Sequence, residues 1–149
     1  NQVVVYSSEK YFTNKNGKYK VVPKLLKASR DDTYDRFVDE FICKNHPARI
    51  AVIDETNLKF NDYKRYVIQA ILNGIKFDQL MPYCDEGLTF DELYHRAKLN
   101  NHNTEYKVIQ KQSELYNRYN IQTTNYHIRH LLTMKHEHLR SILRRDGDL

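Results

Sequence analysis

The sequence predicts an α+β protein that is mainly helical, with a basic β-hairpin and a small sheet at its amino-terminal end followed by a helical array containing helix-turn-helix-like units. Three patterns predict this class. Valine- and tyrosine-rich segments flank an Asn-Gly pair, apolar residues then recur at helical spacing, and a short motif occurs twice in the second half. We expect two subdomains, residues 1–75 and 76–149, which can also fold as one compact domain.

The amino-terminal hairpin is predicted from residues 3–12 and 18–22. The Asn-Gly pair between these segments supplies the positive φ angles that a tight reversal needs. Pro23 cannot donate a ladder hydrogen bond, so we expect the second strand to end there. Residues 49–54 are the only other segment with a convincing strand pattern, and they can pair with the hairpin to complete a three-stranded sheet.

Two helices are expected in the first half of the chain. Ser29, which acidic residues follow, has the pattern of an N-cap, and the helix that it starts should end before Pro47. A second helix should begin at residue 61 or 62 and end at the Asn-Gly pair of residues 73–74. The composition then changes and becomes acidic, so we place the subdomain boundary at residues 76–87.

The second half is predicted to consist of consecutive helices. Residues 89–92, Thr-Phe-Asp-Glu, have the pattern of a capping box at the start of one helix. Further helices are expected over residues 104–119 and from residue 123 or 124 onward. Lys135 interrupts the apolar stripe of the last segment, so we expect a break near Thr133, with Thr133 capping a final helix.

The repeated motif reads Glu-Leu-Tyr-x-Arg at residues 92–96 and 114–118. Its Glu and Arg stand at i and i+4, where an ion pair adds about 0.2–0.5 kcal/mol to a helix, so we interpret the pair as structural. A polar turn and a Thr-x-Tyr segment follow each copy, which is the outline of a helix-turn-helix. Residues 112–131 resemble the helix-turn-helix of small bacterial repressors, except that Tyr116 stands where a small residue is usual. The alternative is a similarity produced by composition and packing alone.

The second copy of the motif predicts a recognition helix that starts near Thr124. Threonine and asparagine can donate to phosphate, and arginine can bind guanine through two hydrogen bonds. The residues of this helix that we expect to contact DNA are Thr124, Asn125, Tyr126, His127 and Arg129.

Two basic segments accompany a net charge of +5, which favours polyanionic partners. From Lys10 to Arg30, with both of these residues counted, there are seven positive residues and no acid. A basic hairpin can follow a phosphate backbone, although lysines equally protect an edge strand from pairing with other chains. The contacts expected from this segment are Lys15, Lys18, Tyr19, Lys20, Lys24 and Lys27. The contacts expected near the carboxyl-terminal end are Arg140, Arg144 and Arg145, which also complement a helix dipole.

The sequence does not predict a catalytic or metal site. The four glycines form no phosphate-binding loop, and no serine or cysteine lies in a nucleophile motif. The Asp-Glu pair at residues 54–55 lacks the third acid of a nuclease site. The histidines at residues 127, 130, 136 and 138 lack a cysteine or carboxylate at zinc-binding spacing. We therefore expect no enzymatic activity and no cofactor.

These patterns favour a DNA-binding regulatory protein of transcription or replication, from a bacterium, plasmid or phage, with double-stranded DNA as its partner. The alternative is a protein-interaction module that binds the transcription or replication machinery, or a second copy of the chain. An RNA-binding protein or a nuclease is less favoured. Two isolated cysteines, Cys43 and Cys84, favour the reducing cytoplasm, and no apolar run is long enough for a membrane span.

Overall fold

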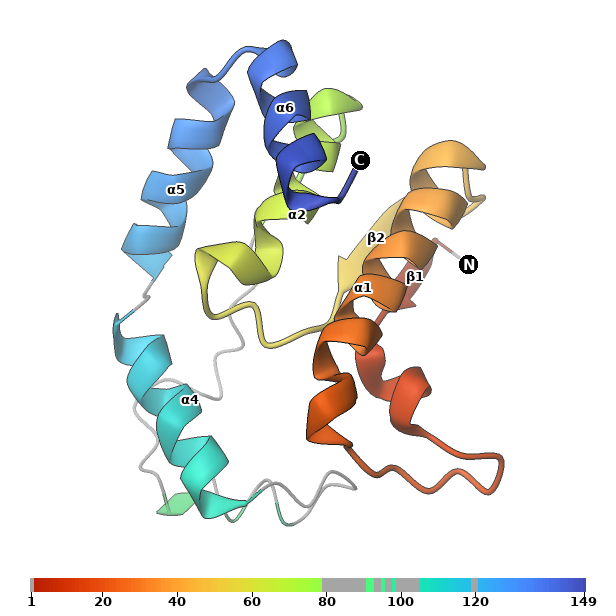
Figure 1. Cartoon of the computed structure of the whole chain (residues 1–149), viewed down its shortest axis with the longest axis vertical. Coiled ribbons are helices and arrows are strands. Elements are labelled where there is room, and N and C mark those ends of the chain that lie inside the picture. Colours follow the sequence, from red (N-terminus) through yellow and green to blue (C-terminus); the bar gives the residue numbers. More distant parts are fainter. Residues whose placement is uncertain (1, 79–90, 93–94, 96–97, 99–104, 119–120) are drawn as a thin grey trace. The chain divides into compact units, whose positions relative to one another are not determined.

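The computed structural model describes residues 2–78, 91–92, 95, 98, 105–118 and 121–149 (Figure 1). These residues are mainly helical, with a small parallel sheet near the amino terminus. The chain forms two compact units, Asn1–Thr56 and Asn57–Leu149, which are called the N-terminal and the C-terminal unit below.

The sheet of the N-terminal unit consists of β1 (Val3–Tyr6) and β2 (Ile50–Ile53), which run parallel. Val3 lies opposite Ile50, and Tyr6 lies opposite Ile53. The helices between the two strands are the 3₁₀ helices η1 (Ser8–Phe12) and η2 (Pro23–Leu25), α1 (Leu26–Arg36) and the π-helix η3 (Phe37–Cys43). The predicted strand at residues 49–54 and the helix end before Pro47 are therefore confirmed.

The predicted hairpin and three-stranded sheet are wrong. The reversal near Gly17 is present. The only antiparallel strand pairing among residues 2–56, however, is one isolated bridge between Thr13 and Tyr19. The first segment turns into η1 because the Ser7 side chain accepts a hydrogen bond from the backbone N of Glu9 at 3.1 Å, which caps a helical turn. β1 therefore finds its partner in β2, at the other end of this unit's sequence.

One face of the small sheet is buried and the other is open. Tyr6 is 1% exposed, packs edge-to-face on Phe37 with ring centroids 5.7 Å apart, and donates to Glu40 Oε2 at 3.1 Å. Burial, together with this hydrogen bond, raises the pKa of Tyr6 to about 12. On the opposite face, Val3 and Ile50 are 52% and 53% exposed. The core of this unit therefore consists of buried apolar side chains from β1, η1, α1 and η3, namely Tyr6, Phe12, Tyr34 and Phe37.

Helix α1 begins three residues before the predicted cap. Pro23 leads η2 directly into α1, and proline is well suited to a first helical turn. Ser29 consequently lies inside the helix, where its buried hydroxyl donates to the Leu26 carbonyl at 2.7 Å. The predicted capping role of Ser29 is wrong, although the helix itself is confirmed.

The helices of the C-terminal unit that the structure delimits are α2 (Phe60–Leu72), α4 (Tyr106–Arg118), α5 (Ile121–Thr133) and α6 (His136–Asp146). The predicted end of α2 at residues 73–74 and the break near Thr133 are confirmed. Thr133 does not cap α6, because its hydroxyl donates to the His130 carbonyl at 2.7 Å and Lys135 occupies the N-cap position. The predicted capping box at residues 89–92 lies largely outside the described residues, as does the turn at residues 119–120.

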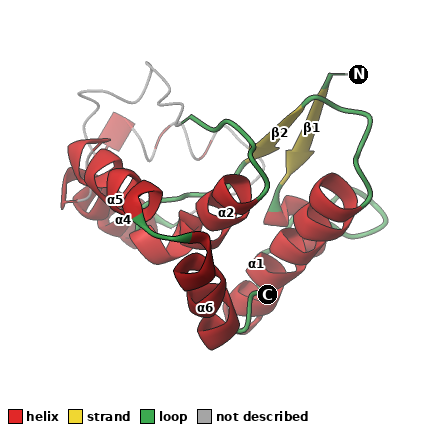
Figure 2. Ribbon diagram, turned by 90° about the horizontal axis from the view of Figure 1, so that it is seen from above, coloured by secondary structure: helices red, strands yellow, loops and turns green. Residues whose placement is uncertain are grey.

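Helices α2, α5 and α6 lie next to one another (Figure 2). They share one apolar core. Its buried members are Tyr63, Val67, Ile68, Leu131, Leu139, Ile142 and Leu143. The subdomain boundary predicted from the sequence placed α2 with the amino-terminal segment. In the structure, the buried face of α2 packs against α5 and α6. None of the described helices is long and apolar enough to cross a membrane.

Two ion pairs, which we call the C-terminal clamp, join the end of α6 to α2. Lys64 Nζ lies 2.7 Å from Asp146 Oδ2, and Arg65 Nη1 lies 3.0 Å from Asp148 Oδ1. Gly147 adopts a φ of 77°, which ends α6 and brings the backbone N of Asp148 to 2.7 Å from the Leu143 carbonyl. The hydrogen bond from Lys64 lowers the pKa of Asp146. The clamp therefore fixes the carboxyl end of α6.

Two leucines test the shared core. Leu139 of α6 is 0% exposed, whereas Leu132 of α5 is 55% exposed. Leu139→Ala should lower the free energy of unfolding by about 2–5 kcal/mol, because it leaves a cavity, and Leu132→Ala by about 0.5 kcal/mol or less. Urea unfolding followed by circular dichroism measures both. Equal decreases would contradict the packing of α6.

The clamp predicts a specific loss of stability in acid. Lys64 lowers the pKa of Asp146 in the folded protein. The contribution of Asp146 to the free energy of unfolding is therefore fully present above its unfolded pKa, about 4, and is lost as the pH falls through the lower folded pKa. Asp146→Asn should lower the unfolding free energy at pH 7 by on the order of 1 kcal/mol and reduce its decline below about pH 4.

The control for this experiment is Asp39→Asn. Asp39 pairs with Lys44 at 3.0 Å, but both side chains are well exposed, so solvent screens the pair. The unfolding free energy of this variant should stay close to that of the parent protein at pH 7. An Asp146→Asn variant with an unchanged acid profile would show that the clamp does not form in solution.

Candidate nucleic-acid interface

The basic segment of the N-terminal unit is organised around a tight reversal, residues 13–20, which we call the lysine loop. Asn14 Oδ1 accepts hydrogen bonds from the backbone N of Asn16 at 2.9 Å and of Lys18 at 3.0 Å. The backbone N of Asn14 donates to the Lys18 carbonyl at 3.0 Å. Gly17 has a φ of 76°, which glycine adopts without strain. The loop therefore has a defined shape, which the Asn14 side chain and the backbone of the loop maintain together.

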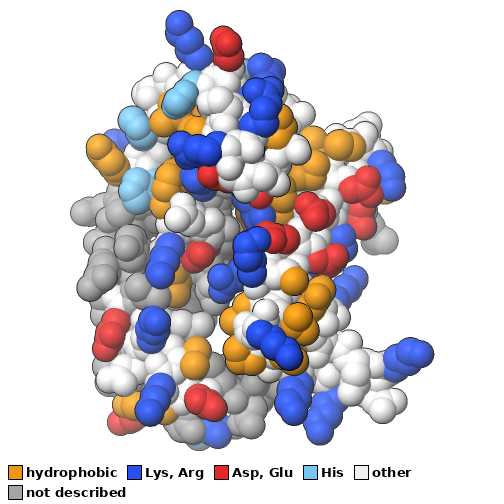
Figure 3. Space-filling view, in the orientation of Figure 1, with side chains coloured by type: hydrophobic (Ala, Val, Ile, Leu, Met, Phe, Trp, Pro, Cys, Tyr) orange, Lys and Arg blue, Asp and Glu red, His pale blue; other side chains and the backbone are white. Residues whose placement is uncertain are grey.

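The lysine loop directs positive charge into solvent. Lys15, Lys18 and Lys20 are exposed, and no ion pair joins them to an acid among the described residues. Figure 3 shows Lys and Arg side chains projecting from this part of the surface, at the lower right. Charges arranged in this way are available to a polyanion.

Aromatic side chains anchor the loop from beneath. Phe12 is buried, and its ring lies edge-to-face with Tyr11 at 5.3 Å and with Tyr19 at 6.4 Å. Tyr19 is half-buried, and burial, followed by the charges of Glu9 and Glu55, raises its pKa. Tyr11, which the sequence-based selection of contact residues omitted, is 41% exposed. No sequence pattern indicates that Tyr11 is more exposed than its neighbours, because its exposure results from the turn of η1.

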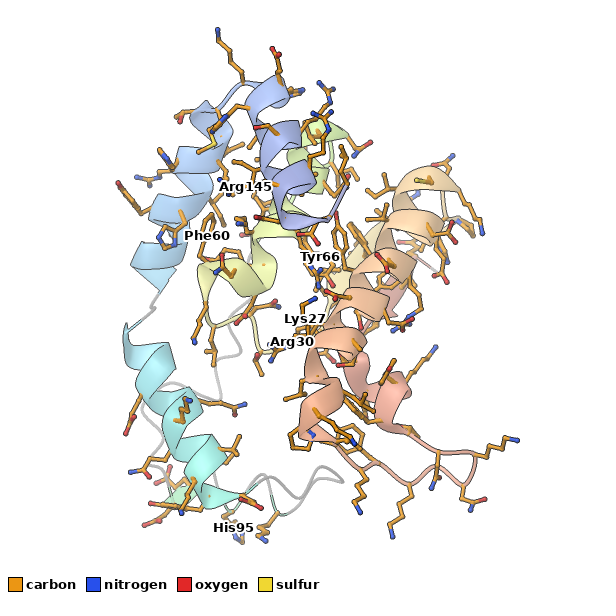
Figure 4. All side chains as sticks on the ribbon, viewed as in Figure 1. Lys27, Arg30, Phe60, Tyr66, His95 and Arg145 are labelled. Carbon is orange, nitrogen blue, oxygen red and sulfur yellow. The ribbon has the colours of Figure 1, made fainter. Side chains whose placement is uncertain are left out.

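The remaining basic residues of the segment lie on η2 and α1. Lys24 is exposed at the last turn of η2. Lys27 and Arg30 lie on α1 (Figure 4), and Lys27 Nζ is 2.8 Å from Asp31 Oδ2. This pair offsets part of the charge of Lys27, so Lys24 and the lysine loop carry the stronger attraction for an anion.

The residues predicted for the start of a recognition helix all lie in α5, but they face different surroundings. Asn125, Tyr126 and Arg129 are exposed, and Tyr126 is 69% exposed. The His127 ring packs against Phe60 of α2, which is labelled in Figure 4, with centroids 4.6 Å apart. The Nδ1 atom of His127 is buried without a hydrogen-bond partner among the described residues. The side chain of Thr124 lies outside the described part. The outward face of α5 thus carries three of the five predicted residues.

The arginines near the carboxyl-terminal end lie on the outward face of α6. Arg140, Arg144 and Arg145 are exposed, opposite the buried Leu139 and Leu143. Arg145 Nε lies 3.3 Å from Asp146 Oδ1, and Arg145 is labelled in Figure 4. His138 and Ser141 share this exposed face, although the sequence-based selection omitted them. Helical spacing around the buried leucines is the signal that identifies them.

Acidic and metal-binding chemistry does not converge at these surfaces in the part of the chain that the structure describes. Glu55, one of the two acids after β2, accepts a hydrogen bond from Ser8 Oγ at 2.5 Å, and Ser8 Oγ lies 3.1 Å from Thr33 Oγ1. This network fixes the start of η1 on α1. Among the described residues, no group of three or more His, Cys, Asp or Glu side chains is arranged to hold a metal ion.

Comparison with known proteins adds no assignment: the chain matches no protein-family model, no curated protein and no solved structure.

The lysine loop predicts a local glycine requirement. Nothing lies within 4 Å of the position that a Cβ at Gly17 would occupy, so the cost of Gly17→Ala comes from its positive φ alone. This variant should lower the free energy of unfolding by about 1–2 kcal/mol. Asn16→Ala removes an exposed side chain at the preceding position and should change the free energy of unfolding by about 0.5 kcal/mol or less. Urea unfolding of both variants checks the loop, and an unaffected Gly17→Ala protein would contradict its geometry.

Proposed function

We propose that this protein binds double-stranded DNA as a regulator of transcription or replication in a bacterium, plasmid or phage, and does so without catalysis. The exposed lysine loop carries this proposal. Lys15, Lys18 and Lys20 extend from a hydrogen-bonded turn, so a phosphate backbone can meet three charges at little cost in backbone order. Arg129, Arg140 and Arg144 add exposed positive charge in the C-terminal unit.

Duplex DNA is favoured over single strands because few of the aromatic rings in and beneath the lysine loop are free to stack. Single-strand binders place successive bases on exposed aromatic faces. Here Phe12 is buried and Tyr19 is half-buried, while Tyr11 alone of the three is exposed. Contacts to phosphate, which a duplex presents continuously along its backbone, therefore suit this surface better than stacking.

Binding of the full chain to random-sequence duplex DNA, single-stranded DNA and RNA across a salt series tests the proposal. Duplex affinity should fall steeply with salt, because bound lysines displace counterions. The double variant Lys15→Ala/Lys18→Ala should reduce the magnitude of the log–log salt slope by about 0.9 for each phosphate that a lysine no longer neutralises. Fluorescence anisotropy with labelled oligonucleotides measures both quantities.

Lys44→Ala is the matched control. Lys44 is also exposed in the N-terminal unit, but it pairs with Asp39, so its removal should leave the salt slope unchanged. Absence of duplex binding at low salt would contradict the proposal. That result would favour the protein-interaction alternative, for which the exposed side chains of Val3, Val5 and Ile50 are the surface to examine.

A further inference from the structure

The last two helices, α5 and α6, have the outline of a helix-turn-helix, which the sequence had predicted for residues 112–131. α5 and α6 are joined by Met134 and Lys135 alone, and both pack on α2 through the shared core. A helix-turn-helix places two helices joined by a short turn on a supporting helix, and its second helix enters the major groove. In this unit α6 is the second helix, and α2 is the support.

Packing also decides which side of each helix is free, and α5 leaves Asn125, Tyr126 and Arg129 exposed. His127 and Ile128 of α5 turn toward the core, with His127 against Phe60 and Leu131 buried. α6 buries one stripe and leaves the opposite side exposed along its length. With 11 residues it is about 16 Å long, and the major groove of B-DNA, about 12 Å wide, admits an α-helix.

We propose that the exposed face of α6 reads base edges in the major groove, an inference that rests on the proposed binding of duplex DNA. Glu137, Ser141 and Arg144 stand at i, i+4 and i+7, so they form the central line of that face. Arg140 lies on one side of this line, and His138 and Arg145 lie on the other. The flanking arginines contact phosphate, while the central line contacts bases.

The chemistry of the central line specifies which bases it fits. The Ser141 hydroxyl donates to the His138 carbonyl at 2.6 Å, which leaves its oxygen as an acceptor toward solvent. Glu137 is also an acceptor, and acceptors pair with the amino groups of cytosine and adenine. Arg144 is a donor that fits the O6 and N7 atoms of guanine. The preferred site therefore presents amino groups near the amino end of α6 and a guanine near its carboxyl end.

The C-terminal clamp keeps this face available and rigid. Asp146 is held by Lys64, and Asp148 by Arg65, so both acids lie in ion pairs with α2. Among the described residues no ion pair joins Arg140 or Arg144 to an acid. Because the clamp fixes the carboxyl end of α6, Arg144 meets a base without first ordering the helix.

The test uses the full chain and three measurements. Random-sequence duplex DNA at low salt gives the affinity for any duplex, and selection from a random duplex library gives a preferred sequence. Affinities for the preferred duplex and a scrambled one then define the preference. Ser141→Ala and Arg144→Ala should each reduce the preference by about tenfold, while the affinity for random duplex falls by less. Arg140→Ala should weaken both duplexes equally and reduce the magnitude of the salt slope by about 0.9.

Lys76→Ala removes an exposed cation of the same unit outside α6, and it should leave the preference unchanged. The competing location is tested with Asn125→Ala on α5. Loss of preference in that variant, with Ser141→Ala and Arg144→Ala unaffected, overturns the assignment to α6. Salt-dependent duplex binding without any enriched sequence also overturns it but leaves the proposed function intact. Failure to bind any duplex overturns both.

Discussion

Leu139 and Leu143 are almost completely shielded from water in the core shared by α2, α5 and α6, and this burial sets what the C-terminal unit presents to solvent. A helix has one apolar stripe, so burying it fixes the rotation of the helix about its own axis. The burial of Leu139 and Leu143 therefore also determines which face of α6 is exposed to solvent. His127 shows the same constraint on α5, because packing against Phe60 turns it inward.

Electrostatics reinforces the arrangement that apolar burial selects. α2 supplies Lys64 and Arg65, whose side chains lie mostly out of water, and α6 with its following residues supplies Asp146 and Asp148. Partly buried charges are costly to leave unpaired, so the two pairs specify one position for the end of α6. The pairing also neutralises acids that lie close to the exposed arginines, which leaves that face positive at neutral pH.

The N-terminal unit reaches a similar result by different means. Its lysine loop is shaped by Asn14 and Gly17 through hydrogen bonds within the turn, while Phe12 anchors it below. The loop needs no regular strand to hold its lysines outward. Each unit thus presents exposed positive charge, and the two surfaces differ in kind, one a turn and the other a helix face.

The sequence by itself determined the features that depend on neighbouring residues. It located the reversal at Gly17, the end of α2 at residues 73–74, the break after Thr133 and the positions of the charges, because turns, caps and breaks are set by a few adjacent side chains. The tertiary structure alone decided the pairing of β1 with distant β2 and the inward direction of His127. Strand partners and buried faces are chosen by burial between segments far apart in the chain, and local propensity carries no information on those interactions.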